Sequence, residues 1–214
     1  MLSSDRRIVL AIVAFASLLA SLPLLLDETS FHWTFSEAGP FERLSIAAWL
    51  ATAAVVIVRI RPLGARAWAF ALLCLVFAAR EADWHKAFTG ESFLKNSFYR
   101  DVARPFEERL MAGAVAILLV ALLLYAGFVI ARFLFLRGGW RSRSGAWLMA
   151  GTALVLIGKV LDRLPATLSV DYGIELGPMV QLYATAFEEG LEMIHPMILG
   201  WSVWISQFEK RYLS

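Results

Sequence analysis

The residues best suited to chemistry lie in the segment FEEGLEMIH, residues 187–195, which contains three glutamates and one histidine. Apolar sequence flanks this segment on both sides, with MVQLYATA before it and PMILGWSVWI after it. Such flanks are typical of a membrane-spanning helix, in which an ionised side chain at the centre costs about 2.5–3.5 kcal/mol. We therefore expect a metal ion, a cationic side chain or bound protons to compensate the three carboxyl groups.

The spacing of these residues matches one face of a helix. Glu188, Glu192 and His195 occupy positions i, i+4 and i+7, whereas Glu189 points about 100° away from them. A carboxylate and an imidazole one turn apart can bind the same metal ion, as in the di-metal sites of helical bundles. Because Pro196 has no N–H group, the sequence also predicts a kinked or opened helix beside the carbonyl of Glu192.

Two other apolar stretches contain charged residues of the same kinds. AAREADWH, residues 78–85, places a glutamate and a histidine four positions apart, and GKVLDR, residues 158–163, places a lysine three positions before an aspartate. We predict that the three segments converge on one buried, outward-facing site. Its predicted metal ligands are Glu81, His85, Asp162, Glu188, Glu192 and His195, with Lys159, Arg80 and Arg163 as counter-charges.

Ligands of this composition favour a divalent metal, namely Zn, Fe or Mn, over Ca or Cu(I). Such an ion activates water against an ester, amide or phosphate, and an iron pair held by the same ligands supports oxidation. With Glu189 as general base and Lys159 steadying a phosphate or an oxyanion, the site would act on a membrane lipid or a lipid-linked substrate. Whether the chain is an enzyme stays open, because other functions need the same residue types.

Three alternatives use these residues differently. Carboxyl groups, a lysine and histidines within apolar spans are typical of a proton- or cation-coupled transporter or channel. A second alternative is structural, with ion pairs that fix the register of the helices or bind a partner subunit. The third alternative is haem ligation by His85 and His195.

The segment EEGLEM resembles the Glu-Glu-x-x-x-Arg motif of intramembrane CAAX-type proteases, although Met193 stands at the arginine position. The spacing of Glu81 and His85 and the late His195 resemble the alkaline ceramidase and adiponectin-receptor superfamily of membrane zinc hydrolases. That superfamily has seven spans and three histidine ligands, whereas this sequence has six apolar stretches and a single late histidine. Both resemblances cover a few residues, and we carry no residue role over from either.

The composition favours a membrane location. Of the 214 residues, 59% are hydrophobic and 18% are charged, whereas a soluble domain averages about 45–50% apolar and about 25% charged residues. The apolar residues gather in runs long enough for helices to cross ~30 Å of hydrocarbon. We expect an all-α, polytopic integral membrane bundle that forms a single transmembrane domain over residues 1–214. Its six predicted spans are residues 8–26, 44–58, 67–85, 110–136, 146–164 and 180–208.

Basic residues predict the orientation of these spans. With six spans, the N-terminus, two of the loops and the C-terminal tail lie on one side, and all four carry arginine or lysine. Because cytoplasmic loops are rich in these residues, we expect both termini in the cytoplasm, in a multi-pass cell membrane protein of the bacterial inner-membrane type.

The sequence also limits the partners. The net charge of +2 and the lack of a basic tract argue against nucleic acid, and the single Cys74 excludes an intramolecular disulfide. The expected partners are membrane lipids, and the oligomeric state stays open.

Overall fold

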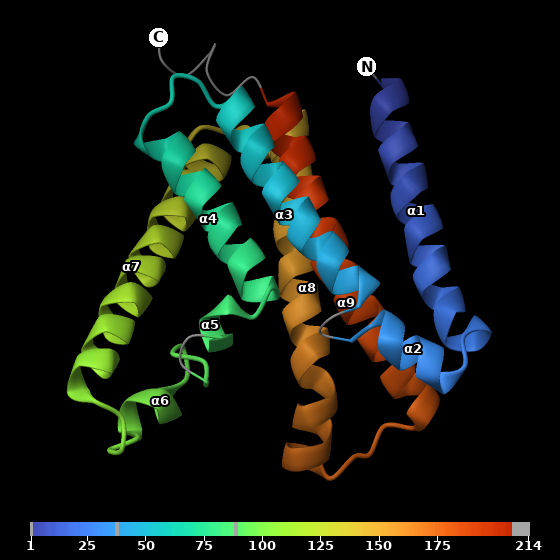
Figure 1. The fold of residues 1–214 in the computed structure, drawn as a ribbon. Helices are drawn as coiled ribbons and strands as arrows, with labels where there is room; N and C mark the ends of the chain where they lie inside the picture. Colours follow the sequence, from blue (N-terminus) through green and yellow to red (C-terminus); the bar gives the residue numbers. More distant parts are fainter. Residues whose placement is uncertain (1, 37–38, 88–89, 207–214) are drawn as a thin grey trace. The chain divides into compact units, whose positions relative to one another are not determined.

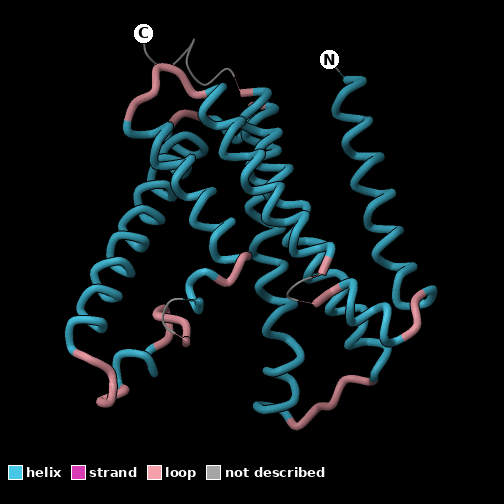
Figure 2. The backbone as a smooth tube through the Cα atoms, viewed as in Figure 1, coloured by secondary structure: helices cyan, strands magenta, loops and turns pink. Residues whose placement is uncertain are grey.

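A computed structural model describes residues 2–36, 39–87 and 90–206, and all regular structure in these ranges is helical (Figures 1 and 2). The prediction of an all-α chain is therefore confirmed for the described residues. The helices are α1 (Leu2–Leu25), α2 (Glu28–Thr34), α3 (Pro40–Arg59), α4 (Ala65–Glu81), α5 (Trp84–Ala87), α6 (Asn96–Arg100), α7 (Phe106–Ala131), α8 (Arg143–Tyr172) and α9 (Pro178–Ile205), with a π-helical turn, η1 (Arg132–Leu136), and a 3₁₀ turn, η2 (Gly139–Arg141).

Four helical segments among the described residues are long and apolar enough to cross a membrane. They are Ser4–Leu25, Pro40–Arg59, Phe106–Leu136 and Arg143–Tyr172, and they correspond to the first, second, fourth and fifth predicted spans. Helix α4 has 17 residues, and three glutamates interrupt the apolar sequence of α9. The number of six spans therefore stays a prediction.

The chain divides into two compact units. The first contains Met1–Ser45 and Ala150–Pro196, and the second contains Ile46–Met149 and Met197–Ser214. Helices α3, α8 and α9 contribute residues to both units.

Two helix ends differ from the sequence-based expectation. The sequence predicts that α8 ends at Pro165, but the helix continues to Tyr172. The proline removes one backbone hydrogen bond, and the helical turn after it still forms. It ends before Gly173, whose φ of 65° is the left-handed conformation that glycine adopts readily.

The predicted span over residues 67–85 is also interrupted. Helix α4 ends at Glu81, and Asp83 follows with φ of 52°. Aspartate tolerates this left-handed conformation better than most residues, and its carboxylate lies 2.8 Å from the ammonium of Lys86. Glu81 and His85 therefore do not share one continuous helix face.

The core of the first unit joins α1, α2 and α9 through Leu19, Phe31, Phe35 and Ala186. Gly190 on α9 allows this packing, since a Cβ atom at this position would overlap with the side chain of Leu19. The glycine thus has a packing role.

Helix α2 begins at a side-chain cap. The carboxylate of Asp27 accepts a hydrogen bond from the amide of Ser30 at 3.0 Å. This backbone hydrogen bond favours the charged form and lowers the pKa of Asp27. The cap stabilises the short helix that carries Phe31 into the core.

The second unit has two apolar clusters. One contains Trp49, Ala53, Cys74 and Ala78 from α3 and α4. The other contains Phe133, Leu134 and Leu148 from η1 and α8. A buried hydrogen bond of 2.8 Å from the hydroxyl of Ser202 to the carbonyl of Ser144 links α9 to the start of α8 within this unit.

The contact between Leu19 and α9 can be tested with a matched pair of glycine substitutions. We expect Gly190→Ala to lower the free energy of unfolding by about 1–3 kcal/mol, because overpacking forces the two helices apart. Gly158→Ala is the control, since its Cβ would lie 3.8 Å from Leu191 Cβ, an ordinary contact. Denaturation in detergent micelles, followed by circular dichroism, measures both. Equal midpoints for the two variants would contradict the packing role of Gly190.

Candidate functional site

Lys159 on α8 lies between two carboxylates of the first unit. Its Nζ atom is 2.8 Å from Oε1 of Glu192 and 3.5 Å from Oδ2 of Asp162. The first contact joins α8 to α9, whereas the second links neighbouring turns of α8. The ammonium group of Lys159 therefore supplies positive charge directly beside the acidic segment of α9.

A third carboxyl group extends the cluster. Glu188 lies one turn before Glu192 on α9, and its carboxyl group lies near Asp162 and Lys159 of α8. Because a carboxylate can only accept hydrogen bonds, a hydrogen bond between two such carboxyl groups would need a proton on one of them. We call Lys159, Asp162, Glu188 and Glu192 the acid–lysine cluster.

The acid–lysine cluster is half-buried and thus more open than predicted. The side chain of Glu192 is 15% exposed, whereas those of Lys159 and Asp162 are 42% and 37% exposed. Arg163 is 84% exposed, with its Nε atom 4.0 Å from Oδ2 of Asp162. A pair this exposed and this long contributes little to stability, so Lys159 is the principal counter-charge.

The backbone of α9 is supported where Pro196 interrupts its hydrogen bonds. The proline cannot donate to the carbonyl of Glu192, which instead accepts a 3.0 Å hydrogen bond from the hydroxyl of Ser45. Ser45 is 2% exposed. The sequence predicts that this carbonyl lacks a helical donor. It does not predict Ser45 as the replacement, because nothing in the sequence distinguishes Ser45 from other serines.

His195 is buried, and its ring orientation is defined by α9 itself. Its Nδ1 atom lies 2.7 Å from the carbonyl oxygen of Leu191. Because a carbonyl only accepts, Nδ1 carries the proton, and in the neutral ring Nε2 is then the basic nitrogen. Histidines that bind metals commonly have this arrangement.

The remaining predicted residues fall in different places. Glu189 is half-buried on α9, and Glu81 lies in the second unit, where its Oε1 atom is 3.3 Å from Nη1 of Arg80. The side chain of His85 lies outside the described residues. The structure thus brings together Lys159 and three of the predicted metal ligands, and the convergence of all three segments stays a prediction.

The described residues contain no group of three or more histidine, cysteine, aspartate or glutamate side chains arranged to hold a metal ion. In the acid–lysine cluster, the ammonium of Lys159 contacts the carboxylate of Glu192, the position predicted for a metal ligand. The chemistry that this arrangement supports directly is the exchange of protons and cations among carboxyl groups.

A double-mutant cycle tests the pair that joins α8 and α9. We expect Lys159→Met or Glu192→Met alone to lower the free energy of unfolding by about 1–3 kcal/mol, since each leaves a half-buried charge unpaired. The double variant should recover part of this loss. Arg163→Met is the control and should stay within about 0.5 kcal/mol of wild type. Strictly additive losses, measured by denaturation in micelles, would show that the two side chains are not coupled.

No protein family model, no curated protein and no solved structure matches this chain.

Proposed function

We propose that this chain is a multi-pass integral membrane protein whose acid–lysine cluster binds and releases protons, as part of proton- or cation-coupled transport. The observation that carries this proposal is the contact of Lys159 with Glu192 and Asp162, with the carboxyl group of Glu188 near the same side chains. Chains of carboxyl groups and a lysine within membrane spans are typical of proton pathways.

The exposed surface of α7 supports the membrane location. The segment Phe106–Leu136 has a mean hydropathy of 2.8, and only 6% of its most apolar window is buried. Several of its large apolar side chains are at least 60% exposed, including Leu110, Ile117, Leu118, Leu124 and Phe128. A surface of this kind is unfavourable in water and suits contact with lipid.

Basic and aromatic side chains near the ends of the spans support the orientation. The guanidinium of Arg59 lies 5.2 Å from the ring centroid of Trp204, and that of Arg141 lies 4.7 Å from the centroid of Trp140. Tryptophan and arginine gather at membrane interfaces, arginine mainly on the cytoplasmic side. We propose six spans with both termini in the cytoplasm, in a membrane of the bacterial inner-membrane type.

The charge balance explains why the cluster would hold a proton. Three carboxyl groups face Lys159 and the exposed Arg163, so a third ionised carboxylate would have no close cation in this cluster. Within a membrane span such a charge costs about 2.5–3.5 kcal/mol. A proton shared by Glu188 and Asp162 removes that cost. Its release and rebinding would couple the cluster to an ion gradient.

Proton flux in reconstituted liposomes tests this function. We expect Glu188→Gln to reduce flux under an imposed membrane potential to the level of empty liposomes, because the amide keeps the shape of the carboxyl group but cannot ionise. Glu175→Gln is the matched control, since Glu175 lies in the connection between α8 and α9, outside the cluster, and accepts a hydrogen bond from Ser169 at the end of α8. Equal flux in wild type and Glu188→Gln would rule out the proposed role.

A second candidate function is the one that the sequence predicts, a divalent metal site for lipid-directed hydrolysis or oxidation. The observation that favours it is the ring orientation of His195, which makes Nε2 the basic nitrogen on the face that carries Glu188 and Glu192. In that function Glu189 is the general base and Lys159 steadies an anionic group of the substrate.

Elemental analysis of protein purified without chelator separates the two candidates. The metal site requires near-stoichiometric Zn, Fe or Mn in wild type and its loss in Glu192→Ala and His195→Ala. His32→Ala is the control, since the side chain of His32 is 68% exposed beside Glu28. Wild-type protein that stays free of metal after each ion is added back would eliminate the metal site, whereas proton transport requires no metal.

A further inference from the structure

The second unit contains a pocket of about 410 Å³ that the sequence did not predict. All of its lining residues belong to the second unit and come from α3, α4, α7, α8, α9 and the connection between α3 and α4. Its volume lies in the range typical of small-molecule sites. We call it the α3–α4 pocket.

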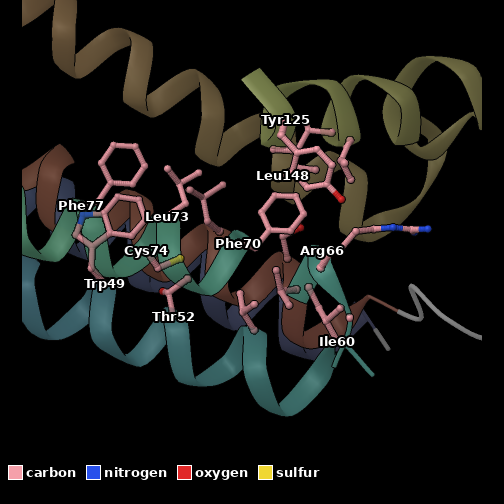
Figure 3. Close-up of a pocket in the computed structure, with 18 of the residues that line it drawn as sticks. Trp49, Thr52, Ile60, Arg66, Phe70, Leu73, Cys74, Phe77, Tyr125 and Leu148 are labelled. Atoms are coloured by element: carbon pink, nitrogen blue, oxygen red, sulfur yellow. The ribbon is translucent and has the colours of Figure 1, made fainter. Parts of the chain in front are cut away.

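One end of the α3–α4 pocket is apolar. Figure 3 shows Trp49 and Phe77 at this end, with Phe70 and Leu73 further along the pocket. The rings of Trp49 and Phe77 stack with centroids 4.6 Å apart. Thr52 lies near this end as well (Figure 3), and the hydroxyl of Ser202, elsewhere in the lining, donates to the carbonyl of Ser144. Because the lining at this end is mainly apolar, it suits a hydrocarbon chain.

The other end of the pocket is basic. The guanidinium of Arg66 points away from the apolar side chains, and the hydroxyl of Tyr125 lies at the same end (Figure 3). Gly64 and Ala65, at the start of α4, also line the pocket, and no side chain caps this helix end. Amide groups at an uncapped helix N-terminus add to the attraction of Arg66 for an anion.

The sequence around this end strengthens the charge argument. Residues 59–66 contain three arginines and no acidic residue. Basic clusters at the cytoplasmic ends of spans bind anionic lipid headgroups. The pocket thus combines an apolar interior with a positive mouth, which is the complement of an anionic amphiphile.

We propose that the α3–α4 pocket binds an anionic phospholipid, with one acyl chain between Trp49 and Phe70 and the phosphate at Arg66. The site is independent of the acid–lysine cluster. It requires the chain to lie in a membrane but does not require proton transport.

Native mass spectrometry of delipidated protein titrated with phosphatidylglycerol tests the headgroup contact. We expect Arg66→Ala to weaken binding about fivefold, the effect of one arginine at an anionic headgroup. Arg100→Ala is the control, because Arg100 lies at the end of α6, outside the basic segment of residues 59–66, and does not line the pocket. It should bind as wild type does. An equal loss in both variants, or equal binding of zwitterionic phosphatidylcholine, would overturn the proposal.

A pair of tryptophan substitutions tests the acyl-chain position. Leu73 lines the pocket, whereas its neighbour Leu72 is 52% exposed and does not. We expect Leu73→Trp to abolish phosphatidylglycerol binding while leaving membrane insertion and proton flux intact, and Leu72→Trp to retain binding. Undiminished binding by Leu73→Trp would overturn the proposal.

Cys74 allows the same test in the wild-type protein, which removes any dependence on the folding of variants. It is the single cysteine of the sequence, is 7% exposed and lines the pocket. We expect phosphatidylglycerol to slow its alkylation by an apolar maleimide, compared with lipid-free micelles. An unchanged rate of alkylation would contradict occupation of the pocket.

Discussion

The contact between Lys159 and Glu192 is the interaction on which the organisation of the first unit depends. It joins α8 and α9 at 2.8 Å and compensates a carboxylate that an apolar helix could not otherwise carry at low cost. Asp162 and Glu188 are held near the same ammonium group, so the cluster contains more acid than base. In the proposed function, this excess of carboxyl groups over cations is the reason why the cluster binds a proton.

Two neighbouring contacts hold α9 in place around this cluster. The hydroxyl of Ser45 donates a hydrogen bond to the carbonyl of Glu192, which has no helical donor because residue 196 is proline. Gly190 permits the close approach of Leu19. On α9 both contacts involve residues within eight positions of Glu188, namely Gly190, Glu192 and Pro196. The first unit thus combines a continuous helix with a local site for polar groups, a combination that a regular apolar helix would not provide.

Much of the fold and part of the candidate site follow from sequence. Hydropathy alone predicts the four helical segments of the described residues that are long and apolar enough to span a membrane. Helical spacing predicts that Glu188 and Glu192 share a face. The predictions of two helix ends were wrong. Pro165 is accommodated inside α8, and α4 ends early, before Asp83 in its left-handed conformation. Ser45 and the α3–α4 pocket arise from contacts distant in sequence, which periodicity does not encode.

The most direct measurement is infrared difference spectroscopy of the protein in lipid, recorded across a pH titration for wild type and Glu188→Gln. A proton shared by Glu188 and Asp162 predicts a carbonyl stretch of a protonated carboxyl group at neutral pH, lost in the variant and shifted by deuterium exchange. Identical spectra for the two proteins, with no protonated carboxyl group at neutral pH, would contradict the proton-binding cluster and leave Lys159 as a structural ion-pair partner.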